Sequence, residues 1–172
     1  KPELLLDKGA NGHSFQMRPS QAAGLQEADL VVWIGPRMTP WLDRALDGIS
    51  NAPQLQLLSA EGTHVQDFGA TDEHDHGDED HDEAKAEEGP EEHGEEDHDH
   101  KGMDPHAWLD PANATHWLGL IAADLSKLDP DNAATYAANA TAAQTQITAL
   151  DAELAATLAP VKDHPFVAFH DA

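Results

Sequence analysis

The chain has 172 residues, with 33 Asp and Glu against nine Lys and Arg, 12 His and no Cys. Its formal charge of −24 argues against a nucleic-acid partner or an anionic membrane surface, because both need a surplus of Lys and Arg. Without cysteine, this sequence cannot form thiolate zinc sites, iron–sulfur clusters, disulfides or a cysteine nucleophile. No apolar run approaches the roughly 20 residues that a membrane-spanning helix needs, so we expect no direct membrane insertion.

The negative charge is concentrated in one segment. Between Asp72 and His100, 16 residues are acidic and six are His, against a single Lys. The rest of the chain has a net charge of −9, which is ordinary for a folded domain. Because residues 69–102 include almost no apolar side chains, they cannot offset the entropy of ordering by burial. We therefore expect a disordered His/acid-rich loop at 69–102, inserted in a folded body.

Strand and helix patterns alternate in the first part of the body. The segment 30–34 is apolar on both faces, which is typical of a strand that is covered on both sides of a parallel sheet. Thr39-Pro40 is an N-cap followed by a first-turn proline. In chain order, the pattern predicts strands at 3–6, 30–34 and 54–58, and helices at 18–28 and 39–49. This alternation predicts an α/β layer of right-handed crossover units.

Two helices and a strand are predicted beyond the acidic loop. Asp110-Pro111 begins one helix, which has an apolar face as far as Leu125. Asp129-Pro130 begins another, whose alanines and leucines recur every three or four residues for about 30 residues, or roughly 45 Å. Such a helix is longer than one small lobe requires. The apolar run at 166–169 predicts a fresh strand, so the chain is expected to end just inside a second lobe.

Three histidines outside the acidic loop are candidates for a metal site. His13 follows a glycine-containing turn, His106 precedes a helix, and His170 follows the last predicted strand. Ligands of open α/β sheets bind beyond the carboxyl ends of the strands. Three neutral imidazoles suit Zn²⁺ and leave a fourth tetrahedral position. Asp104 and Asp171 are candidates to orient the imidazoles by hydrogen bonds without binding the metal themselves. On spacing alone, surface or core histidines without metal explain the pattern equally well.

The motifs around these histidines resemble one known family. They are Gly-His at 12–13 before Arg-Pro-Ser at 18–20, Asp-Pro-His-Ala-Trp-Leu-Asp-Pro at 104–111, and Phe-His-Asp-Ala at 169–172. Together with the His-rich loop, they are similar to the zinc-binding component of bacterial ATP-binding-cassette (ABC) importers, the ZnuA type. The resemblance implies an α/β fold of two Rossmann-like lobes joined by one long rigid helix, with the metal in the cleft between them.

The resemblance also implies how this incomplete chain is divided. Residues 1–128 are expected to form most of the N-terminal lobe, with the disordered loop inside it. Residues 129–160 are expected to form the inter-lobe helix, and residues 161–172 the first strand of the C-terminal lobe.

By this resemblance, His13 and His106 are zinc ligands from the first lobe and His170 is the ligand from the second. Related manganese-binding members carry Glu where this chain has His170, which favours zinc. Gly12 stands where some zinc members have Glu, so the fourth donor is water or a carboxylate outside this chain. The implied function is high-affinity capture of Zn²⁺ in the periplasm and delivery to the membrane permease of an ABC importer. The protein is then a monomer and not an enzyme.

The residues leave two other functions open. A three-His zinc site with an open position also suits a hydrolase, although no His-Glu-x-x-His helix supplies a general base. The second open function is a zinc buffer in which the loop binds most of the metal. The loop contains two His-x-His pairs, and its possible weak zinc ligands are His74, His76, His81, His93, His98 and His100. We interpret the loop as a collector that raises the local zinc concentration or reports zinc abundance; the alternative is a solvated insertion with incidental affinity.

Overall fold

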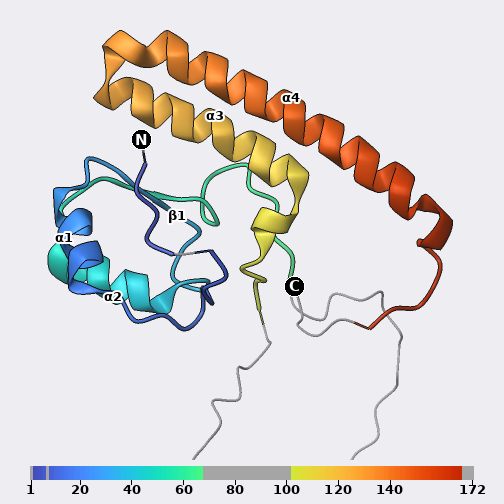
Figure 1. The fold of residues 1–172 in the computed structure, drawn as a ribbon, viewed down its shortest axis with the longest axis horizontal. Coiled ribbons are helices and arrows are strands. Elements are labelled where there is room, and N and C mark those ends of the chain that lie inside the picture. The colour runs from blue at the N-terminus through green and yellow to red at the C-terminus, as the bar shows by residue number, and fades with distance from the viewer. Residues whose placement is uncertain (1, 7, 68–101, 168–172) are drawn as a thin grey trace, which may run out of the picture.

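The computed structural model describes residues 2–6, 8–67 and 102–167 (Figure 1). All of the loop predicted at 69–102 except Gly102 therefore lies outside the described residues. The helices are α1 (Pro19–Glu27), α2 (Pro40–Ile49), α3 (Pro111–Leu128) and α4 (Ala133–Leu158), with 3₁₀ turns η1 (Ala107–Leu109), η2 (Pro130–Asn132) and η3 (Ala159–Val161); the strands are β1 (Val31–Trp33) and β2 (Gln54–Gln56). The four predicted helices and the two inner strands are confirmed.

β1 and β2 are parallel neighbours, with Val31 opposite Gln54 and Trp33 opposite Gln56. Parallel strands need a crossover connection, which α2 provides. A core cluster joins β1 to α1 and α2; its buried members are Leu25, Val31, Trp33, Leu42 and Leu46. The predicted α/β layer is confirmed for this part of the chain.

Prolines and polar residues set the starts of the helices. The side chain of Asp110 accepts a hydrogen bond of 2.7 Å from the amide of Ala112, so it caps α3 as predicted. Thr39 precedes α2 as predicted, but its hydroxyl donates to the Gly35 carbonyl and makes no cap hydrogen bond to the helix. In both helices the first-turn proline forgoes a backbone donor that would have had no partner in the helix.

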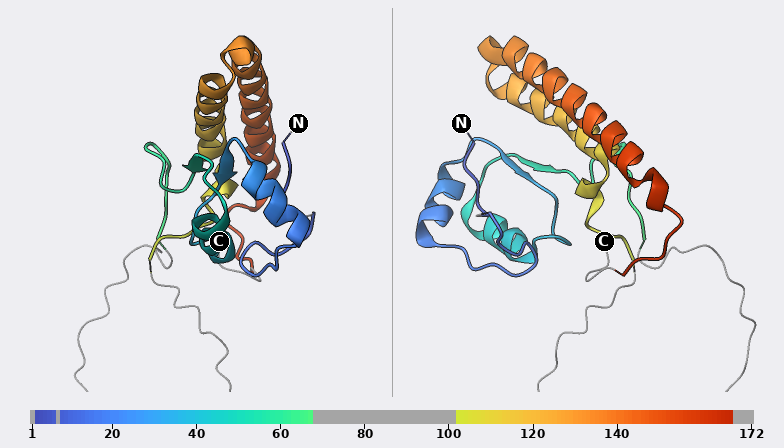
Figure 2. Two further views of the ribbon diagram at one scale, coloured as in Figure 1. Left: turned by 90° about the vertical axis from the view of Figure 1, so that its left-hand side faces the viewer. Right: turned by 45° about the vertical axis from the view of Figure 1, so that its right-hand side comes forward.

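α3 and α4 form a long helical hairpin that lies across the α/β body (Figures 1 and 2). α3 is the helix of the hairpin that faces the α/β body. Its Trp117 is buried there, and the indole N–H donates to the Thr63 hydroxyl at 2.9 Å. α4 lies on the outer side, and none of its 26 residues is buried. The long helix expected at 129–160 is thus a 3₁₀ turn, a 26-residue α-helix and a second 3₁₀ turn.

Two predicted strands, at 3–6 and 166–169, are absent from those of their residues that the structure describes. Residues 3–6 form no strand; the Leu5 carbonyl instead accepts a hydrogen bond from the side chain of Gln21 in α1. Of the strand predicted at 166–169, Phe166 and Val167 are irregular and almost fully exposed, and the other half lies outside the described residues. A strand needs a paired neighbour, and the described residues place none beside either segment.

Across residues 2–6, 8–67 and 102–167, no helix combines the length and the apolar character needed to cross a bilayer.

Candidate metal centre

The structure brings together two of the three predicted ligands. The Nε2 atoms of His13 and His106, 93 residues apart in the sequence, are 3.3 Å apart. Their ring centroids are 5.3 Å apart, and the ring planes make an angle of 67°. Two nitrogens bound to one tetrahedral zinc at about 2.0–2.1 Å are separated by about 3.3–3.4 Å. The pair therefore has the spacing of two ligands that share one such ion.

Asp104 fixes the orientation of the His106 ring. His106 is buried and lies just before η1. One carboxylate oxygen of Asp104 is 2.6 Å from His106 Nδ1 and accepts the backbone N–H of His106 at 2.8 Å. An ionised carboxylate can only accept, so Nδ1 carries the proton and Nε2 keeps a lone pair. That lone pair is on the side of the ring that faces His13.

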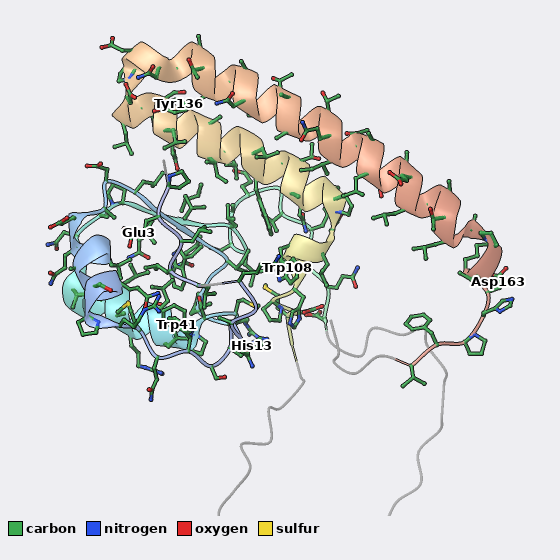
Figure 3. The ribbon with its side chains drawn as sticks, viewed as in Figure 1. Glu3, His13, Trp41, Trp108, Tyr136 and Asp163 are labelled. Atoms are coloured by element: carbon green, nitrogen blue, oxygen red, sulfur yellow. The ribbon has the colours of Figure 1, made fainter. Side chains whose placement is uncertain are left out.

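Contacts of the neighbouring residues and of Trp41 fix the position of His13. The backbone N–H of His13 donates to the side chain of Asn11 at 2.9 Å, which forms a tight polar turn. The indole of Trp41, in α2, donates to the carbonyl of Gly12 at 2.8 Å, and Phe15 packs on Trp41 with ring centroids 5.1 Å apart. Figure 3 shows His13 and Trp41 at the same end of the body. α2 thus fixes the backbone immediately before His13.

An open hollow of about 400 Å³ lies beside His13. It is lined by His13, Ser14, Phe15, Gln16, Trp41 and Arg44. His13 therefore lies at an accessible edge of the body, whereas His106 is buried beneath it. Of the pair, His13 alone lines this hollow.

The other predicted site residues are not in this part of the structure. His170 and Asp171 lie outside the described residues, as do the six loop histidines His74, His76, His81, His93, His98 and His100. Where the chain is described, no group of three or more His, Cys, Asp or Glu side chains is arranged to hold a metal. His64, which lies outside the predicted site, has a side chain that is 78% exposed. Of the three predicted ligands, the described residues thus include His13 and His106.

Two residues that shape the site were missed from the sequence. Trp41 was not singled out as a site residue, but its indole N–H donates to the carbonyl of Gly12. Asn113 was not singled out either, but its side chain is buried and bonded to the segment that carries His106. The only signal for Asn113 was a polar residue on the apolar side of the first turn of a helix.

The family model described as "ZnuA: Zinc-uptake complex component A periplasmic" matches residues 1–172. The chain belongs to the ZnuA family. The high-affinity zinc uptake system protein ZnuA of Paracoccus denitrificans is 51% identical to it, over all of this chain and 55% of that protein. The protein of the same name from Brucella abortus is 37% identical, over all of this chain and 56% of that one.

A solved structure of a ZnuA residue 138–173 deletion mutant with zinc bound has a TM-score of 0.70 to this chain. It is 26% identical, and the match covers 96% of this chain and 53% of that one. The chain therefore spans about half the length of the ZnuA proteins it matches. The resemblance inferred from the three His motifs is confirmed, as is the periplasmic compartment, which is part of the family's description. Members of the ZnuA family are described as a component of a zinc-uptake complex, so this is a family of transport proteins and not of enzymes.

Proposed function

We propose that this protein captures Zn²⁺ with high affinity in the periplasm and delivers it to the membrane permease of an ABC-type zinc importer. The supporting observation is the spacing of 3.3 Å between His13 Nε2 and His106 Nε2, which suits two ligands of one tetrahedral ion. The names of the relatives from Paracoccus denitrificans and Brucella abortus, both zinc uptake proteins, support zinc as the cargo.

The proposed ligands of the captured ion are His13, His106 and His170, with water or a carboxylate from outside this chain as the fourth donor. Imidazole nitrogen is a good ligand for Zn²⁺, whereas Mn²⁺ prefers oxygen donors. The Asp104 carboxylate makes His106 a better donor by fixing its tautomer and orientation. Asp171 is proposed to serve His170 in the same way.

We also propose the arrangement in which two α/β lobes share the ion and α4 joins them as a rigid spacer. His13 and His106 come from the first lobe, and His170 comes from the second. Separating the lobes removes His170 from the ion and leaves two ligands, so the permease can release zinc by opening the cleft. The protein acts as a monomer in this proposal, and the loop at 69–102 collects zinc for the site.

The hydrolase alternative has less support. A zinc hydrolase needs a general base beside the metal-bound water. The carboxylate next to the His pair, that of Asp104, is already bonded to the ring and backbone of His106. A buffer in which the loop binds most of the zinc does not explain why His13 and His106 lie next to each other.

The test is a zinc titration of the full-length protein against a competing chelator, for three single variants: His13→Ala, His106→Ala and His170→Ala. Each is expected to weaken the tight site by roughly 100-fold or more, because a tetrahedral site loses a ligand. His64→Ala is the matched control, since its imidazole is largely exposed and 3.6 Å from Asp110. Deleting residues 72–100 is expected to remove weak sites only. Loss of the tight site on that deletion, with the three variants unchanged, would establish the buffer instead.

A further inference from the structure

Asn113, on the first turn of α3, is a buried polar residue, with 2% of its surface exposed. Its side-chain oxygen accepts the backbone N–H of His64 at 2.7 Å. Its side-chain nitrogen donates to the carbonyl of His64 at 2.7 Å and to the carbonyl of Ala107 at 2.9 Å. Both donor hydrogens and the acceptor of the amide are thus used, so the side chain is held in one orientation.

These three hydrogen bonds join two separate stretches of chain. One is the segment 61–66, which continues from β2. The other is η1, which begins directly after His106. The two stretches also meet at the backbone, where the amide of Asp104 donates to the carbonyl of Gln66 at 2.7 Å. Asn113 therefore fixes the turn that carries His106 to the part of the chain that extends the sheet.

Two neighbours on α3 hold the same segment through hydrogen bonds that do not involve the turn of His106. The Nε2–H of His116 donates to the carbonyl of Glu61 at 2.8 Å, beside Gly62, whose φ of +87° favours glycine. The indole N–H of Trp117 donates to the hydroxyl of Thr63 at 2.9 Å, and that hydroxyl donates to the Leu57 carbonyl at 2.8 Å. These contacts allow the attachment of the segment to be separated from the placement of the ligand.

We propose that Asn113 is a positioning residue that holds His106 Nε2 at the tetrahedral spacing from His13 Nε2 and thereby sets the affinity for zinc. This inference rests on the proposed function. His13 is fixed to α2 through Trp41, and α2 packs on the core with β1. His106 needs an equally firm tie to that core, and the amide of Asn113 supplies it through the segment after β2. A ligand that can drift loses part of its binding free energy to reordering when the ion arrives.

The test compares Asn113→Ala and Asn113→Asp with the parent in the full-length protein. Asn113→Ala removes all three hydrogen bonds. Asn113→Asp keeps the shape and the acceptor for His64 N–H, but it replaces the donor to the two carbonyls with an oxygen. The expected result is a 10- to 100-fold loss of zinc affinity in a chelator competition, which is roughly the range for residues that orient a metal ligand. Co²⁺ bound in place of zinc is expected to show a weaker, shifted visible spectrum, since its coordination becomes less regular.

Thr63→Val is the matched control, because it removes the Thr63 hydrogen bonds to Trp117 and Leu57 but leaves the turn of His106 tied. It is expected to lower the melting temperature and leave both zinc affinity and the Co²⁺ spectrum unchanged. Unchanged affinity and spectrum in a folded Asn113 variant would overturn the inference while the proposed function stands. If neither variant folds, Asn113 is a folding residue and the inference also fails. If the parent binds zinc no better than its His13→Ala variant, the proposed function fails as well.

Discussion

At the scale of single residues, the carboxylate of Asp104 makes two hydrogen bonds to His106, one to the ring and one to the backbone. Asp104→Ala removes both, so the ring can rotate and exchange tautomers. The expected result is roughly a 10- to 100-fold weaker zinc site, and Asp104→Asn is expected to fall between that variant and the parent because its amide oxygen still accepts. The measurement is zinc affinity by chelator competition in the full-length protein.

Asp124→Asn is the matched control for Asp104. Asp124 is an α3 carboxylate that pairs with Lys127 at 2.6 Å, and neither residue contacts the His pair. Asp124→Asn changes the net charge by the same amount as Asp104→Asn but removes no hydrogen bond to His13 or His106. An equal loss of zinc affinity in both variants would show that the acidity of the protein, and not the hydrogen bonds of Asp104, accounts for the effect.

The sequence was informative about residues whose chemistry is recognisable in a motif, and less so about residues whose role depends on packing. His13, His106 and Asp104 were singled out by type and context, and the structure places these three together. The role of Asn113 was missed because it depends on the carbonyls of His64 and Ala107, which approach one another only in the fold. Trp41 was missed for a similar reason, since its partner is the backbone of Gly12.

At the scale of elements, the turn between α3 and α4 is held by a titratable pair. The hydroxyl of Tyr136 donates to the carboxylate of Asp129 at 2.8 Å, and the side chain of Asn132 donates to the same oxygen at 2.8 Å. These hydrogen bonds, with that from Tyr136 the stronger influence, hold the pKa of Asp129 below its ordinary value of 3.8. The same hydrogen bond to Asp129 raises the pKa of Tyr136 above its ordinary value of 10.0.

Tyr136→Phe is therefore expected to lower the melting temperature in a pH-dependent way. A lowered carboxyl pKa stabilises the fold above pH 3.8, and this contribution is lost as the pH falls through the folded-state pKa. A raised hydroxyl pKa stabilises below pH 10.0, and this contribution is lost as the pH rises through the folded-state pKa. The deficit of the variant is thus largest between these limits and shrinks at both ends. Circular dichroism melts from pH 2 to 11 measure it.

Asp129→Asn provides the control for this pair, because its amide does not titrate. In that background, Tyr136→Phe is expected to produce a small deficit that is the same at acidic and neutral pH. If the deficit in melting temperature still became smaller at acidic pH, a carboxylate other than Asp129 would account for the pH dependence.

The packing of the first elements leads to a prediction about stability. Leu46 of α2 is among the most deeply buried side chains of the core, with 2% of its surface exposed. Leu46→Ala leaves a cavity in that core and is expected to lower the free energy of unfolding by about 2–5 kcal/mol. Leu4→Ala is the matched control: Leu4 is 78% exposed, so a change within about 0.5 kcal/mol is expected. Urea denaturation compares the two, and equal losses would contradict the assigned core.

Elements were predictable where local signals and tertiary partners agree. β1 is an apolar run and β2 alternates Gln and Leu; both are bounded by turn residues, and each has the other as a neighbour. α1, α2 and α3 are marked by prolines at their first turns, and Asp110 also caps α3 through its side chain. The segment 3–6 carries the same local signal as a strand, but its backbone is engaged by Gln21 of α1. Strand pairing is a tertiary event, so an apolar run alone cannot predict it.

At the scale of the whole molecule, α4 presents an apolar stripe that the described residues leave uncovered. Leu150, Leu154 and Leu158 follow one another at intervals of four residues and are 52%, 44% and 55% exposed. In Figure 2 this end of α4 extends beyond the α/β body. Relatives of about twice this length have a further half of chain, which in our two-lobe proposal packs against this end of the helix.

Substitution of Leu154 tests this arrangement in the full-length protein. If the second lobe covers the stripe, Leu154→Ala removes buried methyl groups and is expected to lower the free energy of unfolding by about 2–4 kcal/mol. Glu153→Ala is the matched control on the adjacent, exposed position, where a change within about 0.5 kcal/mol is expected. Because the proposed site spans both lobes, Leu154→Ala is also expected to weaken zinc binding, whereas Glu153→Ala is not. Equal, small effects of the two variants on unfolding would show that the stripe stays in water, and the two-lobe arrangement about α4 would then be wrong.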